Sequence, residues 1–126
     1  MITIDSDVLI EILDKKSEKG DGALKQILQS GEEIATTAIS LHEVLYGLHK
    51  YAKPVKEILL LPLLNYTKKD AVLSSKIELE AEEKGSPIRR TDAMIAAIAI
   101  NNGAKLCTFD LKHFNLLKDF GLKLFP

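Results

Sequence analysis

Segments typical of β-strands alternate with segments typical of helices along the whole chain of 126 residues. Strands and helices that alternate in this way form βαβ units, in which the strands run parallel and helices cover both faces of the sheet. The strands expected from short β-type runs are residues 2–5, 33–38, 64–66, 105–108 and 122–125. The alternation therefore predicts an α/β fold with a mostly parallel sheet of about five strands.

The helices between these strands are marked by apolar residues at helical spacing and by residues that start or end a helix. Gly20 and Gly22 are expected to interrupt the chain before the second helix. Ser40 and Glu43 match the capping box S-x-x-E, which predicts that the third helix begins at Ser40. Thr67 is predicted to cap the fifth helix. The expected helices are residues 8–13, 23–29, 40–52, 55–61, 68–84 and 92–102, with a short helix or turn at 110–117.

The composition is that of an ordinary globular domain, with 46% hydrophobic and 28% charged residues. Its length predicts a single domain over residues 1–126. The longest strongly apolar stretch, residues 58–64, is far shorter than the roughly 20 residues that cross a bilayer, so no membrane span is expected. The first residues show no secretory signal, and we expect a cytoplasmic protein. The single cysteine, Cys107, is predicted to be a buried strand thiol.

Four carboxylates are expected to meet at one edge of the predicted sheet. Asp5 directly follows the first strand, Glu43 lies in the first turn of the helix after the second strand, and Asp110 comes just after the fourth. Asp92 opens the helix that leads into the fourth strand, so its end of that helix should lie at the same edge. Because ligands bind at the carboxyl edge of parallel strands, these acids mark the candidate site.

Each of these acids alone could simply cap a helix. Together they need a cation, because two carboxylates about 5 Å apart repel by roughly 3 kcal/mol at an effective dielectric of 20. Oxygen ligands without an organised Cys or His set favour Mg²⁺ or Mn²⁺ over zinc, and His42, His49 and His113 have no metal-ligand spacing. One or two such ions would activate water and stabilise charge on a phosphodiester. The pattern therefore predicts metal-assisted hydrolysis of a phosphate backbone.

The segments around the four acids carry a resemblance that covers essentially the whole chain; they are Ile4–Ile10, Ile39–Leu48, Thr91–Ala97 and Leu106–Asp110. They resemble the PIN domain family, specifically the VapC-type toxin ribonucleases of toxin–antitoxin pairs. The resemblance implies a PIN-like three-layer αβα sandwich and a metal-dependent endoribonuclease. It places Asp5, Glu43, Asp92 and Asp110 on the family's catalytic, metal-binding acids. It also implies a homodimer and an antitoxin protein that blocks the site.

One departure from the family pattern is Asp7, where the family more often has a small neutral residue. This fifth acid could join the metal shell or cap the first helix, and the cap is the favoured role. Ser6 and Thr108 carry hydroxyls that could hold metal-bound waters or a substrate phosphate, and ordinary turn capping is an equal alternative. The role of the side chains around the four acids therefore stays open.

Binding to RNA must use a local basic patch, because the net charge of −1 provides no overall attraction to nucleic acid. Arg89 and Arg90, just before Asp92, are the predicted contacts to the RNA backbone, with solvated surface charge as the alternative. Lys68, Lys69 and Lys112 are possible helpers. Dimerisation is expected through residues 55–61, whose run of Ile58 and three leucines is more apolar than one helix face can bury.

Three other functions compete with the toxin ribonuclease. A response-regulator receiver has an acidic pocket at the same sheet edge, but it needs an Asp after the third strand, and residues 64–67 provide none. A haloacid dehalogenase-type phosphatase is suggested by Asp5-Ser6-Asp7 alone, which is a weak motif. The third is a PIN-domain nuclease that processes RNA and is not a toxin. A small antitoxin gene directly upstream would favour the toxin.

Overall fold

The computed structural model describes residues 1–126 and contains a five-stranded, all-parallel sheet in the order β3–β2–β1–β4–β5. The predicted α/β fold is therefore confirmed, with shorter strands than expected and a third strand that lies slightly earlier in the chain. The strands are β1 (Ile2–Ile4), β2 (Ile34–Thr37), β3 (Leu63–Leu64), β4 (Lys105–Cys107) and β5 (Lys123–Leu124). The central strand β1 pairs with β2 on one side and β4 on the other.

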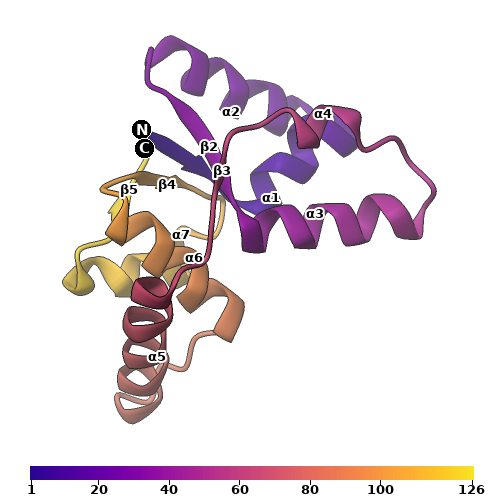
Figure 1. The fold of residues 1–126 in the computed structure, drawn as a ribbon. Helices are drawn as coiled ribbons and strands as arrows, with labels where there is room; N and C mark the ends of the chain where they lie inside the picture. The colour runs from indigo at the N-terminus through magenta and orange to yellow at the C-terminus, as the bar shows by residue number, and fades with distance from the viewer.

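Helices cover both faces of the sheet, and the two chain termini lie next to each other (Figure 1). On one side lie α1 (Ser6–Leu9), the π-helical turn η1 (Ile10–Lys15), α2 (Glu18–Gln29), α3 (Ala38–Lys50) and α4 (Lys56–Leu59). On the other side lie α5 (Lys68–Glu83), α6 (Arg90–Asn101), α7 (Leu111–Phe114) and the 3-10 helix η2 (Asn115–Phe120). No helix has the length and apolar character needed to cross a membrane.

Each face of the sheet has its own hydrophobic cluster, because successive strand residues point to opposite sides. Ile2, Ile4 and Cys107 pack with the helices of the first half of the chain. Leu106 packs with α5, α6 and α7. Thr3, which is paired with Leu106 across β1 and β4, points to this second cluster. Cys107 is buried as predicted, and burial together with nearby acids raises the pKa of its thiol to about 11.

The second helix differs from its prediction because it includes both glycines that were expected to precede it. Ser17 caps α2 by accepting a hydrogen bond from the backbone N–H of Gly20 (3.0 Å). A Cβ atom on Gly20 would lie 2.3 Å from the carbonyl oxygen of Glu11 in η1. Gly20 therefore lets η1 and α2 approach closely within a helix, a packing role that local sequence patterns do not reveal.

The predicted capping box at the start of the third helix is also wrong. Thr37, at the end of β2, caps α3 by accepting from the backbone N–H of Ser40 (3.0 Å), so Ser40 is the third helical residue and Glu43 lies in the second turn. A similar shift affects the first helix, where Asp5 is the cap. The favoured role of Asp7 as that cap is therefore wrong.

The helix α5 begins as predicted, whereas α6 begins earlier than predicted. Thr67 caps α5 with a complete capping box, as predicted for the cap residue. The helix α6 begins at Arg90, with Arg89 as its cap residue, so Asp92 is its third residue and does not open it. Its side chain still lies in the first helical turn, at the amino end of a helix whose last residue leads into β4.

Candidate active site

Asp5 lies at the carboxyl edge of the sheet, where β1 ends and α1 begins. Its backbone N–H donates to the carbonyl of Cys107 (2.9 Å), so the ladder between β1 and β4 extends to this residue. Its carboxylate caps α1 by accepting from the backbone N–H of Ser6 (2.8 Å). Only 5% of Asp5 is exposed. It is a buried carboxylate at the end of the central strand.

Two hydroxyl groups connect Asp5 to neighbouring elements. Thr108, just after β4, donates to Oδ2 of Asp5 (2.8 Å) and accepts from the backbone N–H of Asp110 (3.1 Å). The hydroxyl of Ser6 lies 3.1 Å from Oε1 of Glu43 on α3 and 3.4 Å from Oδ1 of Asp5. Both hydroxyls therefore bond to acids of the site and hold the carboxylate of Asp5 in a fixed orientation.

Asp92 faces the same edge from α6 and has Arg89 as its counter-ion. The guanidinium of Arg89 donates from Nε to Oδ2 (3.1 Å) and from Nη2 to Oδ1 (3.2 Å). These hydrogen bonds and the charge of Asp92 raise the pKa of Arg89, with smaller contributions from the charges of Glu43 and Asp5. Asp92 is thus in direct contact with Arg89, and Glu43 and Asp5 lie within electrostatic range of the same guanidinium. The sequence predicted that these acids lie at one edge of the sheet.

Asp7 and Asp110 form the outer part of the same cluster. Asp7 accepts from the backbone N–H of Phe109 (3.1 Å), which ties α1 to the loop after β4. Burial raises the pKa of Asp7, the hydrogen bond from Phe109 opposes this rise, and the charge of Asp110 adds to it. Asp110 caps α7, and its Oδ1 lies 2.8 Å from Nδ1 of His113. Asp7 thus connects the first turn of α1 to the loop after β4.

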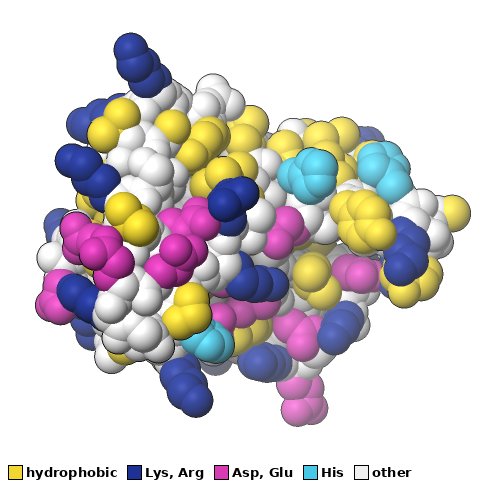
Figure 2. All heavy atoms as spheres, turned by 90° about the horizontal axis from the view of Figure 1, so that it is seen from below, with side chains coloured by type: hydrophobic (Ala, Val, Ile, Leu, Met, Phe, Trp, Pro, Cys, Tyr) yellow, Lys and Arg dark blue, Asp and Glu magenta, His cyan; other side chains and the backbone are white.

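The negative charges at this edge are poorly compensated. Burial, the charge of Asp7 and the charge of Asp92 raise the pKa of Asp5 to about 7, although hydrogen bonds from Thr108 and Ser6 oppose the rise. Viewed from below, the surface of the molecule carries several acidic side chains, with lysines and arginines among them (Figure 2). Buried like charges of this kind favour the binding of a cation.

The chemistry of the donor atoms fits a divalent cation, because all of them are the hard oxygens that Mg²⁺ and Mn²⁺ prefer. No three acidic, His or Cys side chains are arranged to enclose a metal ion by themselves. Mg²⁺, however, is commonly held by one or two carboxylates and several waters. Asp5 and Asp92, which interact electrostatically, provide such a pair. The residues therefore fit a hydrated divalent cation and not a complete protein cage.

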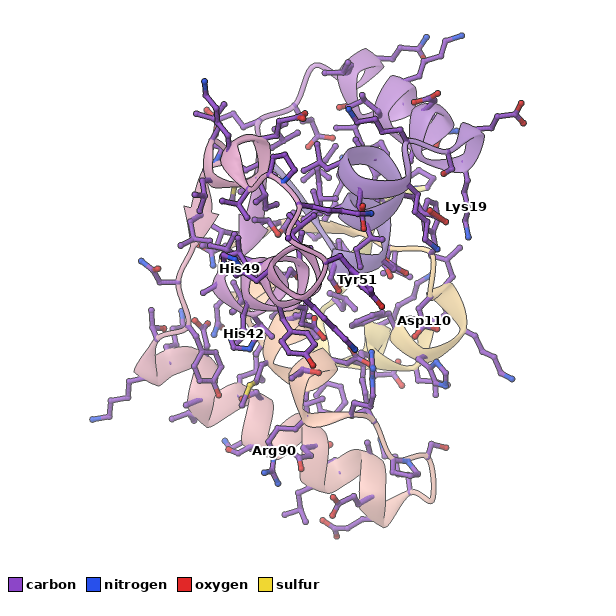
Figure 3. All side chains as sticks on the ribbon, turned by 90° about the vertical axis from the view of Figure 1, so that its right-hand side faces the viewer. Lys19, His42, His49, Tyr51, Arg90 and Asp110 are labelled. Carbon is purple, nitrogen blue, oxygen red and sulfur yellow. The ribbon has the colours of Figure 1, made fainter.

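Arg90, predicted together with Arg89 to contact RNA, does not face the carboxylates. Its Nε donates to Oε1 of Glu78 on α5 (3.1 Å), and it lies well apart from Asp110 (Figure 3). His42 also lies away from Asp110, on α3 (Figure 3). Of the two predicted arginines, only Arg89 is therefore part of the candidate site.

Lys19 is a basic residue near the site that the sequence did not single out. Its ammonium group lies 4.1 Å from the centre of the Phe109 ring, within range of a cation–π interaction. Lys19 and Asp110 lie on the same side of the molecule (Figure 3). No spacing in the sequence relates α2 to the loop after β4, so only the tertiary structure could reveal this residue.

Comparisons with known proteins agree with the fold. A family model described as the PIN domain matches residues 2–118. No curated protein sequence matches the chain. The chain is 26% identical to a chain in the structure of VapBC2 from Rickettsia felis bound to a DNA fragment from their promoter, with a TM-score of 0.80 over 99% of this chain and 98% of that chain.

Two further solved structures share the fold at lower identity. A chain of VapBC-1 from nontypeable Haemophilus influenzae is 20% identical, with a TM-score of 0.81 over 99% of this chain and 97% of that chain. A chain of DNA-bound VapBC from Salmonella typhimurium is 23% identical, with a TM-score of 0.80 over 98% of this chain and 96% of that chain. The five-stranded parallel sheet and its helices are therefore an arrangement already known from VapBC structures.

Proposed function

The chain belongs to the PIN domain family, a family of nucleases, and we propose that it is a metal-dependent endoribonuclease that acts as the toxin of a toxin–antitoxin pair. The observation that carries the proposal is the position of Asp5, whose carboxyl is buried at the carboxyl edge of the sheet and whose pKa is raised to about 7 by burial and by the charges of Asp7 and Asp92. A receiver or a haloacid dehalogenase-type phosphatase is set aside, because the match to the PIN family covers residues 2–118.

We assign the cation to Asp5 and Asp92, with Glu43 and Asp110 as further oxygen ligands directly or through water. A bound Mg²⁺ or Mn²⁺ would supply an activated water and stabilise the negative charge that develops on the phosphodiester. Thr108 keeps Oδ2 of Asp5 in place by its hydrogen bond of 2.8 Å. Ser6 holds Glu43 through its hydroxyl and the second oxygen of Asp5 through its backbone N–H. The chain's own contribution is thus the orientation of these acids.

Arg89 is the residue that we expect to hold the RNA backbone at this site. Its side chain is largely exposed, whereas the carboxylate of Asp92 to which it bonds is buried. A cation bound to Asp92 would take over the neutralisation of that carboxylate and leave the fork of Arg89 free for a phosphate. Arg90 is engaged by Glu78 and is not assigned this role.

A toxin is favoured over an RNA-processing nuclease because the similar structures include VapBC complexes and a structure described as a toxin-antitoxin complex from Klebsiella pneumoniae. We therefore expect an antitoxin protein as a partner. We also expect a homodimer through α4, where Ile58 is buried but Leu59 and Leu60 are 57% and 74% exposed. Light scattering that shows only monomer at micromolar concentration would contradict the dimer.

The proposed reaction is tested by RNA cleavage with EDTA, with added Mg²⁺ or Mn²⁺, and with the variant Asp92→Asn. We expect cleavage only with metal, and none from the variant, because an anionic oxygen ligand is lost. Thermal melts of the same samples provide the control, since Asn keeps the size of the side chain and its favourable place in the first helical turn. Full activity in EDTA, or an active and folded Asp92→Asn protein, would contradict the metal-nuclease proposal.

A matched pair of arginine variants tests the assignment of the RNA contact. Arg89→Ala should weaken RNA binding for all sequences and reduce the salt dependence of binding, because a phosphate contact is lost. Arg90→Ala, one residue away and paired with Glu78, should leave both quantities close to those of the unmodified protein. Equal effects of the two substitutions would mean that neither arginine has a specific place at the site.

A further inference from the structure

A pocket opens beside the candidate active site, between the loop that follows α5 and the helices α7 and η2. It encloses about 190 Å³. The buried residues Ala81 and Leu117 are part of its lining, together with Ile88, Leu116 and Phe120. Pockets for whole drug-sized ligands run to roughly 300–1,000 Å³. This pocket is therefore of the size for one ring system and its substituents.

Two residues of the pocket lining connect it to residues of the acidic edge. Ile88 is followed directly by Arg89, whose guanidinium forks onto the carboxylate of Asp92. On the other side, His113 lines the pocket, and its Nδ1 lies 2.8 Å from Asp110. A group in this pocket is thus a neighbour of the site on both sides, where the flanking part of a polynucleotide would lie.

The lining combines apolar surfaces with a few polar groups at the rim. Phe120 contributes an aromatic ring, and the ammonium group of Lys84 lies 5.8 Å from the centre of that ring. Ser86 and Asp119 add a hydroxyl and a carboxylate. A nucleobase has the matching surfaces, because its faces stack on apolar and aromatic side chains and its edge carries donors and acceptors. The attached phosphate complements nearby cations such as Lys84 and Arg89.

We propose that this pocket binds the nucleobase of a nucleotide that flanks the bond to be cut. The inference rests on the proposed ribonuclease function and adds to it a source of sequence preference. Contacts from Arg89 to phosphate cannot select a sequence, since every nucleotide has the same phosphate. Selection requires contacts to a base, and this pocket supplies apolar walls together with Ser86 and Asp119 as groups for the base edge.

Nuclear magnetic resonance of the isotopically labelled full chain provides a test that does not depend on catalysis. The probes are the four dinucleoside monophosphates ApA, CpC, GpG and UpU, and an abasic dinucleotide with the same sugar–phosphate backbone. We expect backbone amide shifts at Ser86, Ile88 and Leu116, strongest for one of the four bases and absent with the abasic probe. Shifts that are equal with the abasic probe, or that lie elsewhere on the surface, would overturn the proposal.

Two variants and a matched control locate the binding. Leu116→Ala removes part of a wall, and Ser86→Phe fills the space at the rim; both residues are exposed, so the fold should persist. Each should weaken binding of the preferred dinucleotide roughly tenfold, the effect of losing one base stack. Leu28→Ala is the control, because Leu28 on α2 is 65% exposed, similar to Leu116, but is not part of the pocket. Unchanged affinity in both pocket variants would refute the assignment.

A cleavage assay run in parallel separates this inference from the proposed function. Metal-dependent cleavage without dinucleotide binding in the pocket would overturn the pocket and leave the nuclease in place. Dinucleotide binding without cleavage would overturn the proposed function and leave a nucleobase site. If the pocket variants weaken binding of a protein partner but leave dinucleotide binding unchanged, the pocket holds a protein segment, and the nucleobase proposal is wrong.

Discussion

The two ends of the sheet differ in how far their charges are compensated by neighbouring groups of opposite sign. At the amino end, the charges alternate in sign: Glu32 accepts from the N-terminal ammonium of Met1 (3.0 Å) and from Nζ of Lys105 (2.8 Å). At the carboxyl end, Asp5 and Asp7 lie close together with the same sign, and Asp5 is almost completely buried. The amino end therefore has compensated charges, whereas at the carboxyl end Arg89 pairs with Asp92 and no basic group pairs with Asp5 or Asp7.

This difference shows that the carboxyl end of the sheet lowers the stability of the fold. A buried carboxylate with a raised pKa makes the folded state less stable at neutral pH, and perturbed acids of this kind gather at functional sites. The hydroxyl of Thr108 and the backbone N–H of Ser6 reduce the unfavourable energy of Asp5 but do not remove it. The contrast predicts that neutralising the carboxyl end destroys function and stabilises the fold, while neutralising the amino end does neither.

The largest expected effect is the loss of RNA cleavage in Asp5→Asn. Asparagine can still cap α1 through its one oxygen, and its amide NH2 can donate to the hydroxyl oxygen of Thr108, but it lacks the negative charge that we assign to cation binding. We expect cleavage to fall by roughly 100-fold or more at saturating Mg²⁺. The measurements are the rate of RNA cleavage and the melting temperature of the same sample. If the variant keeps its activity, the uncompensated charge at the carboxyl end is not needed for cleavage, and the contrast between the two ends has no functional role.

The second prediction concerns the pH dependence of stability in EDTA. The pKa of Asp5 is about 7 in the folded state and 3.8 in its unperturbed state, so the folded protein binds this proton more tightly. Stability should therefore fall as the pH rises from about 4 to about 7, and the full penalty remains above that range. Asp5→Asn should reduce this slope and raise the melting temperature at pH 8 by on the order of 5–10 °C.

Glu32→Gln is the matched control for this slope. Hydrogen bonds from Lys105 and the N-terminal ammonium lower the pKa of Glu32, so it stays ionised throughout the range in which Asp5 titrates. Its stabilising effect is lost only as the pH falls below the pKa of an ordinary glutamate. The variant should therefore keep the slope of the unmodified protein between about pH 5 and 8. If Glu32→Gln abolishes the slope, or if Asp5→Asn keeps it, the pH dependence of stability does not come from Asp5, and the prediction is wrong.

The sequence predicted the parts of this arrangement that depend on order along the chain. Strands followed by helices place Asp5 and Glu43 at one edge of a parallel sheet, and the return helix brings Asp92 to them. The sequence could not choose between Arg89 and Arg90, because neighbouring helical residues point in different directions and only the position of α6 determines which one meets the acids.

The errors in the helix starts have a related cause. Thr37 and Ser40 both carry hydroxyls that can cap a helix, and the length of β2 decides which one does. Gly20 was expected to break the chain, since glycine disfavours helices, but its missing side chain is what allows η1 to contact α2. In both cases a tertiary contact overrides a local preference, so a single sequence contains no signal for the outcome.

A smaller effect is expected for Thr108→Val, which removes the hydroxyl that bonds to Asp5 and accepts from Asp110. The substitution preserves the shape of the side chain but leaves buried groups without a partner, and should destabilise the fold by about 1–3 kcal/mol. It should also reduce cleavage, because Oδ2 of Asp5 is no longer held in place. Denaturant unfolding measures the first effect, and the cleavage rate of the folded variant measures the second.

Thr3→Val provides the contrast in the interior of the same sheet. Thr3 is fully buried on β1, and its hydroxyl is the one buried side-chain polar atom without a hydrogen-bond partner. Replacing it by a methyl group of similar shape should stabilise the fold by about 1 kcal/mol and leave cleavage unchanged. If both threonine variants change stability in the same direction, hydrogen bonding at the carboxyl end does not have the special importance that we infer.

The smallest expected effect is that of Glu32→Gln on stability at neutral pH. The three charges at the amino end are partly exposed, so water and salt screen their attraction, and ordering the long side chains offsets part of the gain. We expect the melting temperature to fall by no more than about 2 °C at low salt, and the difference from the unmodified protein to shrink between about 20 mM and about 500 mM salt. A large, salt-independent loss of stability would mean that this end of the sheet also depends on a buried charge. The contrast between the two ends would then be wrong.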